Sequence, residues 1–417
     1  MRKTFLLYLL FVSCAQPNAD FLADTGALEA KIDSYVDNGS LAVVQVYLED
    51  HEGNKLYSYS RKNDTLIKSE INENTWFRIW SMSKIITISI ALDLVEEGII
   101  SMNDDISKYL PELKNLKIAR GIAGEKLNQW DNKDLCPITF EEHDKRMTIS
   151  DLINHKAGFY YSTTNIDCLN KLIAAQNLAA SKDSDDFLRK IAQLPLIQEP
   201  GEGYYYGLNT TILGMVCEKA TGKTLNALLF EKIVDPYQIK GLAYKKKAGV
   251  ALLPVFSGAD SLVRKASAGE LDIFGQDLPQ YEENDQLFLG GEGMIATSNG
   301  YADFLRIILN KGILNNIRLL EEATIAEMTS PQTLTDNPYG YNGYNLWITN
   351  DKFREEGTGD SGLWTGGGYE GTHFWIDPKR KFVGLIMTQI FMPNSKASNK
   401  DNEIRGLIYN QIFNNEK

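Results

Sequence analysis

The sequence predicts an α/β protein in which an antiparallel sheet is built from the N- and C-terminal segments and flanked by helices. A helical domain is expected as an insertion between those segments. Strand-like segments occur near the start of the chain, and further ones return near its end. The long stretch between them has a mostly helical pattern with polar connections. We therefore expect an α/β domain formed by residues 25–103 together with 286–417, and an all-helical insertion over 104–285.

Two hairpins are predicted at the ends of the sheet. Residues 41–48 are rich in β-branched and apolar side chains, and residues 55–59 alternate apolar with polar ones after a turn at Gly53. Near the C-terminus, residues 372–376 and 382–387 flank a turn that contains Pro378. A last helix is expected over residues 402–413.

The middle of the chain contains two clearly helical segments, at residues 148–154 and 208–220. The segment 115–146 is polar and irregular, and we expect it to be a loop-like insertion. No internal repeat is evident.

The first twenty residues differ in composition from the rest and predict an export signal with a lipoprotein tether. A basic head at Arg2 and Lys3 precedes a short apolar run over 4–12, and Ser13-Cys14 follows. A small residue before a cysteine at this point resembles a bacterial lipoprotein processing site, with Cys14 as the lipidated residue. The alternative is a cleaved secretory signal in which Cys14 is incidental. Under both interpretations the protein is exported, and we expect a periplasmic or cell-surface lipoprotein of a bacterium.

The net charge, the cysteines and the histidines argue against several classes of function. A net charge of −12 argues against a nucleic-acid partner. Three further cysteines, at positions 136, 168 and 217, form no metal spacing and no disulfide framework, although one bridge between two of them remains open. The four histidines have no metal-ligand spacing and no Gly-x-Ser-x-Gly elbow is present, so we expect neither a cofactor nor an α/β-hydrolase.

The pair Ser81 and Lys84 is the most informative pattern. A serine three residues before a lysine, at the start of an apolar helix that runs to Gly98, places a hydroxyl and an amine on one helical face. An amine within hydrogen-bond distance can accept the proton of a serine nucleophile. Taken alone, the same pattern also fits a serine that only caps the helix.

Several landmarks in order resemble the serine β-lactamase and penicillin-binding-protein superfamily. More closely, they resemble its class C β-lactamase-like branch, which includes carboxylesterases and D-amino-acid peptidases. The landmarks run from about residue 30 to 412 and comprise the segments 77–84, 94–98, 106–112, 149–158, 200–222 and 290–297. The resemblance implies a β-lactamase/transpeptidase-like fold and a covalent acyl-serine intermediate.

Carried over residue by residue, the resemblance implies that Ser81 is acylated, that Lys84 helps to deprotonate it and that Tyr206 shares the general-base role. Tyr206 lies eight residues before Gly214, the spacing of the esterase-type members, whereas Tyr205 fits the nine-residue spacing of members with Tyr-x-Asn. The asparagine of that second motif is missing at its usual place. Asn209 is close by and is expected as a further residue lining the site.

The third motif of the family, Lys-Thr-Gly or its variants, has two registers here. Direct reading gives Trp364-Thr365-Gly366 with Gly367 donating an oxyanion N–H. Counting back from residues 376–378 gives Gly366-Gly367-Gly368 with Tyr369 as donor, which we favour. In both registers the lysine of the motif is missing. His373 lies on the strand just after the motif, and the sequence leaves open whether it faces the site.

These implications favour an esterase acting on small or lipophilic esters, because the charge that would hold a substrate carboxylate is missing. A β-lactamase or a D-amino-acid (DD-)peptidase is the first alternative, so the expected partner is a small-molecule ester, amide or β-lactam. The second alternative is a catalytically weak lipoprotein that binds cell-wall fragments. The membrane is expected as a partner only through the lipid at Cys14.

Overall fold

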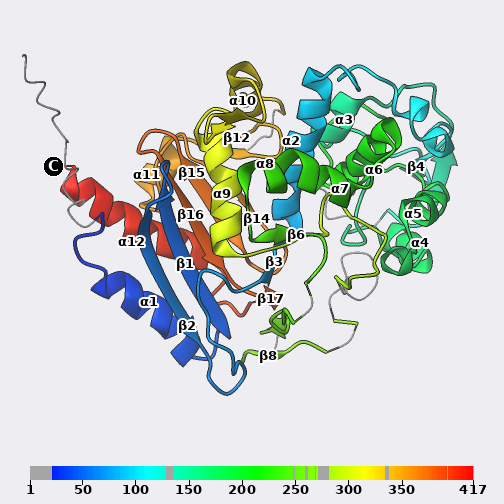
Figure 1. Ribbon diagram of the computed structural model, residues 1–417. Coiled ribbons are helices and arrows are strands. Elements are labelled where there is room, and N and C mark those ends of the chain that lie inside the picture. The colour runs from blue at the N-terminus through cyan, green and yellow to red at the C-terminus, as the bar shows by residue number, and fades with distance from the viewer. Residues whose placement is uncertain are drawn as a thin grey trace, which may run out of the picture.

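The main element is a seven-stranded antiparallel sheet whose strands come from both ends of the chain, as the sequence predicts (Figure 1). A computed structural model describes residues 21–127, 135–247, 249–258, 262–267, 269–270, 281–333, 338–391 and 393–416. The strand order is β12-β13-β14-β15-β16-β1-β2. In chain order these strands are β1 (Val43–Asp50), β2 (Lys55–Lys62), β12 (Gly340–Asn342), β13 (Trp347–Thr349), β14 (Trp364–Gly367), β15 (His373–Asp377) and β16 (Phe382–Met387).

Both hairpins expected from the sequence are present. Strand β1 pairs with β2 on one side and with β16 on the other, so the first strand of the chain lies beside the last strand of the sheet. Strands β15 and β16 meet in the register Asp377↔Phe382, which places the turn around Pro378 as predicted. The pairing of β1 with β16 closes the domain, because it ties residues more than 300 positions apart.

Helices cover both faces of the sheet (Figure 1). Helices α1 and α12 pack together on one face, and α9 packs on β1, β15 and β16 from the other. The final helix is longer than the predicted 402–413. The helices are α1 (Gly26–Asp37), α2 (Ser83–Glu96), α3 (Ile149–Ile153), α4 (Asp167–Ala175), α5 (Ser184–Ile191), α6 (Asn209–Thr221), α7 (Leu225–Leu229), α8 (Asp235–Tyr237), α9 (Ser298–Leu309), α10 (Glu322–Met328), α11 (Asp351–Glu355) and α12 (Lys400–Asn415).

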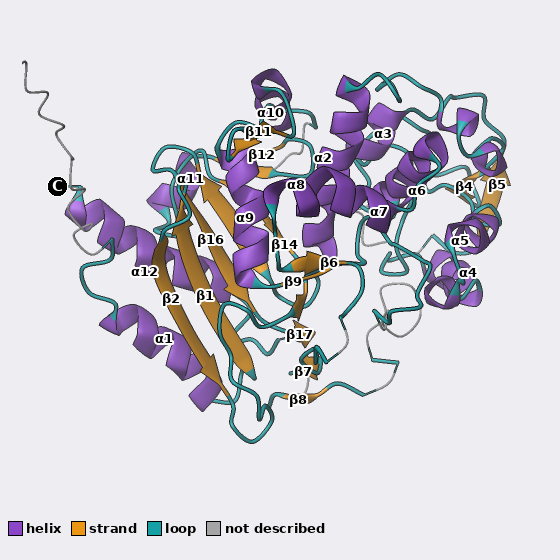
Figure 2. Ribbon diagram, in the orientation of Figure 1, coloured by secondary structure: helices purple, strands orange, loops and turns teal. Residues whose placement is uncertain are grey.

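Helix α2 lies between the sheet with its covering α9 and the group of helices α3 to α8 (Figure 2). The sequence predicts an apolar helix here. The structure buries every residue from Ser83 to Leu92, because α2 contacts elements on all sides, including α6 and α7. The predicted helices at 148–154 and 208–220 are α3 and α6, and Thr148 caps α3 through a reciprocal pair of bonds with Asp151. The domain boundaries at 103/104 and 285/286 stay a prediction.

The described parts of the segment 115–146, residues 115–127 and 135–146, are more regular than the predicted loop. It contains strands β4 (Ile118–Gly121) and β5 (Ile138–Glu141), which pair antiparallel, and Ile118 also bridges to Leu196. A disulfide between Cys136 and Cys168, with 6.0 Å between their Cα atoms, ties this segment to α4. The one bridge that the sequence left open is therefore assigned, and Cys217 is a buried free thiol.

Short strands bring distant motifs together. In a three-stranded sheet, β9 (Ile295–Ala296) pairs with β3 (Phe77–Arg78) and with β6 (Leu242–Ala243). The segment before Ser81 thus lies beside the glycine-rich segment 290–297. The remaining short strands are β7 (Phe256–Ser257), β8 (Arg264–Lys265), β10 (Ile313–Leu314), β11 (Ile317–Arg318) and β17 (Ile390–Phe391).

A tight loop joins β14 to β15 and rests on the segment before Ser81. The Gly368 N–H bonds the Thr372 carbonyl at 2.8 Å, the Gly371 N–H bonds the Gly368 carbonyl, and Gly371 has a φ of +77°. This is the geometry of a three-residue hairpin loop that needs glycine at its last position. A Cβ on Gly368 would overlap the carbonyl oxygen of Ile79, so only glycine allows this close approach.

The predicted signal peptide and Cys14 lie outside the described residues. Within the described part of the chain, no helix has the length and the apolar character needed to cross a membrane.

One buried acid in the β14–β15 loop is not paired in the way buried carboxylates usually are. The Glu370 side chain has no exposed surface. Burial raises its pKa from the ordinary 4.5 to about 7, against the opposing influence of the Arg78 guanidinium. Its backbone carbonyl accepts bonds from Ile390 N–H and from the Thr388 hydroxyl, so the loop cannot easily turn the side chain out to water.

We predict that Glu370→Gln removes a pH dependence of stability. A carboxyl whose pKa is raised on folding contributes its full stabilisation to the folded state at pH values below its pKa in the unfolded chain. This stabilisation is lost as the pH rises through its pKa in the folded state. The wild type should therefore lose on the order of 3 kcal/mol of unfolding free energy between pH 4.5 and 7, relative to Glu370→Gln. Urea unfolding of both proteins across this range measures the difference. Plots of unfolding free energy against pH that run parallel for the two proteins would contradict the prediction.

Candidate active site

The candidate nucleophile Ser81 lies in a tight helical turn, Trp80–Met82, that leads directly into α2. Its side chain is half-buried. Hydrogen bonds from Ile79 N–H to Met294 O and from Met82 N–H to Ile79 O fix the turn. Trp80 has a φ of +46°, a strained value for a bulky residue. Such strain concentrates at functional sites, where it fixes the direction of a neighbouring side chain.

Lys84, in the first turn of α2, is the group that contacts Ser81. Its Nζ lies 3.0 Å from Ser81 Oγ, and the side chain has no exposed surface. The same Nζ lies 2.9 Å from Tyr161 Oη and 2.9 Å from the Gly291 carbonyl. A hydroxyl and an amine in direct contact at a helix start form the arrangement that the Ser-x-x-Lys spacing predicts.

A buried carboxyl, Glu292, lies behind Lys84. Its Oε1 is 3.4 Å from Lys84 Nζ and accepts a hydrogen bond from Tyr161 Oη, and its Oε2 accepts one from Thr211 Oγ1. Neither Lys84 nor Glu292 has exposed side-chain surface. Sequence patterns alone did not indicate Glu292, Tyr161 or Thr211 as residues of the site. One sequence feature could have indicated Glu292: it is the charged residue in the segment 290–296, whose other residues are small or apolar.

The loop that carries Glu292 is fastened along α2. Gly290 O accepts from Thr87 Oγ1 at 2.7 Å, Gly291 O contacts Lys84, and Met294 N–H donates to Ser83 Oγ at 3.2 Å. A Cβ on Gly290 would lie 2.8 Å from the Thr210 carbonyl, so this glycine lets the loop enter between α2 and α6.

Tyr206, the expected partner base, lies beside Lys84. Its ring centroid is 4.9 Å from Lys84 Nζ and 5.8 Å from the ring of Tyr161. Tyr206 is half-buried, whereas Tyr161 is buried. Burial and the nearby Glu292 carboxylate hold the pKa of Tyr161 well above its usual range, which keeps this hydroxyl protonated. Tyr206 therefore stays the candidate for proton exchange with substrate.

His155 supports the tyrosine loop. Its ring stacks on Tyr206 with centroids 4.8 Å apart, and its backbone carbonyl accepts from Tyr205 N–H at 2.7 Å. Burial, reinforced by the Lys84 charge, lowers the pKa of His155 to about 3, so the imidazole is neutral. Asn209 is buried and its amide nitrogen lies 3.2 Å from His155 Nδ1. Asn209 thus supports the loop from behind and does not line the opening, in contrast to the expectation.

The third motif reaches the site at the end of β14. The Gly368 N–H bonds to the Thr372 carbonyl, on the β15 side of the strand. Because the N–H groups of successive residues in an antiparallel strand point to opposite sides, the Gly367 N–H points away from β15, to the edge where β13 lies. Among the described residues, β13 pairs with β14 only at Trp364 and Thr365, so this edge is uncovered from Gly366 onward. The Tyr369 ring lies edge-on to Trp80, with centroids 5.4 Å apart. Both donors considered from the sequence, Gly367 and Tyr369, flank the glycine that contacts Ile79.

His373 does not face the site. Its Nε2 lies 2.8 Å from Arg405 Nη1 of α12, whereas the neighbouring Phe374 packs against Tyr301 of α9. Tyr301 Oη also donates to Met82 O at 2.8 Å, so the α9 face of the sheet is the one that adjoins Ser81. Strand alternation therefore places His373 on the far face. The sequence could not settle this because it does not show which face each strand residue takes.

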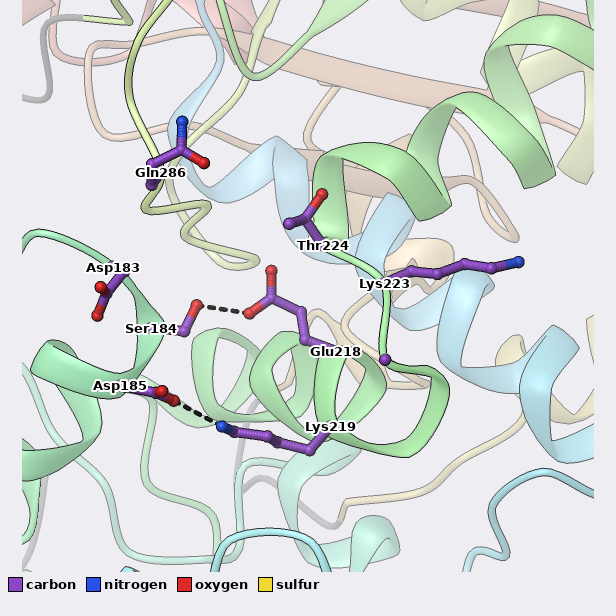
Figure 3. A pocket seen from close by; sticks show the side chains of 9 residues that line it. Asp183, Ser184, Asp185, Glu218, Lys219, Lys223, Thr224 and Gln286 are labelled. Atoms are coloured by element: carbon purple, nitrogen blue, oxygen red, sulfur yellow. Dashed lines mark hydrogen bonds and ion pairs between the residues drawn. The ribbon is translucent and has the colours of Figure 1, made fainter.

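A surface pocket of about 450 Å³ lies between α5 and α6, and Figure 3 shows its lining. Two pairs of its polar side chains are bonded to one another. Ser184 Oγ bonds Glu218, and Lys219 Nζ lies 2.6 Å from Asp185. None of Ser81, Lys84 and Tyr206 lines it. We therefore assign the candidate active site to the Ser81 group and not to this pocket.

Within the described residues, no group of three His, Cys, Asp or Glu side chains is arranged to hold a metal ion.

Comparison with known proteins places this geometry in a family. The family model described as Beta-lactamase matches residues 28–407. An acyltransferase, mokF, of Monascus pilosus is 25% identical over 312 residues, covering 73% of this chain and 70% of that protein. A putative D-alanyl-D-alanine carboxypeptidase of Salmonella agona is 24% identical over 329 residues, covering 74% of this chain and 70% of that protein.

Among solved structures, EstCE1, described as a hydrolase with promiscuous acyltransferase activity, superposes with a TM-score of 0.71 at 18% identity. The match covers 92% of this chain and 97% of that one. At this identity the likeness shows the fold, whereas the family model spans most of the sequence itself. The chain therefore belongs to the β-lactamase family of serine hydrolases.

Proposed function

We propose that this protein is an exported esterase-like hydrolase that works through an acyl-serine intermediate on small or lipophilic esters. The observation that carries the proposal is the 3.0 Å contact between Lys84 Nζ and Ser81 Oγ at the start of α2. A serine hydroxyl is a weak nucleophile unless a base within this distance accepts its proton.

In the proposed reaction, Ser81 Oγ attacks the ester carbonyl while its proton passes to Lys84. The N–H of Ser81 and that of Gly367 or Tyr369 stabilise the oxyanion that forms. Tyr206 passes a proton to the leaving alcohol, and a water molecule then hydrolyses the acyl-serine with the same groups in reverse order. The position of Ser81 just before α2 favours negative charge at the oxyanion, since a helix N-terminus carries a partial positive charge.

The third motif supports an ester over a substrate that carries a carboxylate. Trp364 or Gly366 occupies the position where the family's lysine would hold such a carboxylate. The half-buried Trp364 indole contributes apolar surface and no charge at neutral pH.

A D-amino-acid peptidase is the second candidate. It is favoured by the Salmonella relative, which is named a putative D-alanyl-D-alanine carboxypeptidase. The binding-only alternative has less support, because a pure binder does not need an amine in contact with a half-buried serine hydroxyl.

Export is supported by the leader-like composition of residues 1–20 and by the Cys136–Cys168 bridge. Disulfides of this kind persist in oxidising compartments outside the cytosol. The lipid anchor at Cys14 is part of the proposal.

We predict that cells expressing the full chain incorporate labelled palmitate into the protein and that Cys14→Ser abolishes the label. If the wild type is secreted without the label, Cys14 is not lipidated, but the protein is still exported through a cleaved signal. If the wild type stays in the cytosol, the proposal of export is contradicted. Fractionation of the same cells distinguishes the two results.

For the reaction itself, we predict that the soluble form starting after Asp20 hydrolyses p-nitrophenyl butyrate. Ser81→Ala should lower the rate more than about a thousandfold, because the nucleophile is lost. Ser184→Ala, which alters a hydroxyl in the α5–α6 pocket, is the matched control and should keep its rate within about twofold, as is usual for a surface position.

The same proteins should be assayed on a cephalosporin and on a D-alanyl-D-alanine peptide. Efficient cephalosporin turnover that depends on Ser81 would contradict the esterase assignment. Peptide cleavage without ester hydrolysis would favour the peptidase. Equal ester hydrolysis by wild type and Ser81→Ala would contradict the acyl-serine mechanism.

A further inference from the structure

The imidazole of His155 is held by hydrogen bonds at both of its ring nitrogens. Its Nε2 lies 3.2 Å from Asn345 Oδ1, and its Nδ1 lies 3.4 Å from the Gly207 backbone nitrogen and 3.2 Å from Asn209 Nδ2. The Gly207 N–H can only donate, so Nδ1 is the acceptor and Nε2 carries the hydrogen that goes to Asn345. Burial lowers the pKa of His155 to about 3, and a neutral ring matches this single tautomer. One orientation of the ring therefore satisfies all three neighbours.

The hydrogen bond between His155 and Asn345 joins two separate parts of the fold. His155 directly follows the end of α3, whereas Asn345 lies in the turn 343–346 between β12 and β13 of the seven-stranded sheet. Both residues have a left-handed backbone, with φ values of +53° and +55°. Such values are uncommon outside glycine and concentrate at functional sites, although asparagine tolerates them better than most residues. Each end of the bond thus depends on a backbone conformation that few residues adopt.

The turn that carries Asn345 is anchored on α10, which lies beside β12 (Figure 1). Tyr344 is buried, its N–H donates to Met328 O at 2.9 Å, and its Oη donates to a Glu327 carboxylate oxygen at 2.6 Å. Both acceptors belong to α10. Asn345 therefore has a fixed place from which its side chain can orient the imidazole.

The oriented imidazole lies against Tyr206. The two rings stack with centroids 4.8 Å apart and 24° between their planes, and Lys84 Nζ lies 4.9 Å from the centroid of the Tyr206 ring. Gly207 directly follows Tyr206, and a Cβ on it would overlap the Phe159 carbonyl oxygen, so glycine is what lets its N–H approach His155. His155 thus holds Tyr206 through its ring and through the next N–H of the chain.

From these contacts we infer that Asn345 is a positioning residue for Tyr206, and that it acts through His155 to place the phenol that protonates the leaving alcohol. The inference rests on the proposed function, in which Tyr206 is that proton donor. In this step the ester C–O bond and the Tyr206 O–H bond break while the O–H bond of the alcohol forms. The proton that left Ser81 then restores the phenol. Without the Asn345 bond the imidazole can turn, and a displaced phenol protonates the alcohol poorly.

The leaving group of the substrate separates a positioning role from a merely structural one. The p-nitrophenolate ion is stable and can leave without a proton, whereas ethoxide is strongly basic and needs one as it leaves. For Asn345→Gly we expect kcat/KM on ethyl butyrate to fall more than about tenfold and kcat/KM on p-nitrophenyl butyrate to change less than about threefold. Both esters carry the same acyl group, and glycine keeps the left-handed backbone of the turn. Titration of the released acid measures the first rate, and absorbance measures the second.

Three further variants serve as controls. Asn315→Gly makes the same change at a left-handed residue, with φ of +52°, in the exposed turn between β10 and β11, and it should leave both rates within about twofold. Asn345→Asp keeps an acceptor oxygen for the Nε2–H and should retain most of the activity on ethyl butyrate. His155→Phe keeps a ring that can stack but removes its hydrogen bonds. Adding Asn345→Gly to it should cause no further loss, because Asn345 acts through His155.

Equal effects of Asn345→Gly on the two esters, including no effect on either, would overturn the inference, as would an equal loss in Asn345→Asp. A further loss when Asn345→Gly is added to His155→Phe would overturn the action through His155. If His155→Phe does not fold, the comparison of the two esters decides. A wild type that cleaves only the p-nitrophenyl ester would overturn the inference and leave the acyl-serine mechanism intact. Absence of Ser81-dependent hydrolysis of both esters would refute the proposed function itself, and the inference with it.

Discussion

The burial of the Lys84 amine is the constraint on which the rest of this structure depends. A long cationic side chain without exposed surface is costly unless oxygen atoms surround it. Here the oxygens come from three separate parts of the chain: the turn before α2, the loop after α3, and the glycine-rich segment, which supplies both the Gly291 carbonyl and the Glu292 side chain. The proposed nucleophile, Ser81, is one of these partners, so the interactions that compensate the buried amine also position its hydroxyl.

That requirement explains several features away from the amine. Gly290 allows the glycine-rich loop to enter between α2 and α6, and β3 pairs with β9 to hold the loop beside the serine turn. Gly368 lets the end of β14 approach Ile79, which brings the third motif to the same place. The sheet in turn depends on β1 beside β16, because this pairing joins the two ends of the chain that supply the two sides of the site.

The site has an inner and an outer part. Lys84, Tyr161 and Glu292 are buried, whereas Ser81 and Tyr206 are half-buried and accessible to a substrate. This separation keeps the amine and the carboxyl away from solvent, whereas the serine and the tyrosine that we propose meet the substrate stay partly exposed. It also explains why a neutral His155 suits the position behind Tyr206, since a second positive charge there would oppose the charge on Lys84.

Much of the fold and the centre of the site could be predicted from the sequence, because both depend on local patterns. Alternation and turn residues predicted the two hairpins, and the Ser81–Lys84 spacing predicted their contact. The questions left open and the wrong predictions both occurred where the decisive information is not local. The face taken by His373 depends on strand alternation counted from its neighbours, and β4 and β5 gain their order from pairing, the contact with Leu196 and the disulfide. Glu292 was missed because its role arises only when three distant segments meet around Lys84.

The central claim is that Ser81 carries the acyl group. The most direct measurement is acid quenching of the soluble protein during turnover of p-nitrophenyl butyrate, followed by intact-mass and peptide mass spectrometry. The account predicts a mass increase of one butyryl group, located on the peptide that contains Ser81 and absent in Ser81→Ala. Turnover without any adduct on that peptide, or with an adduct on another residue, would contradict it.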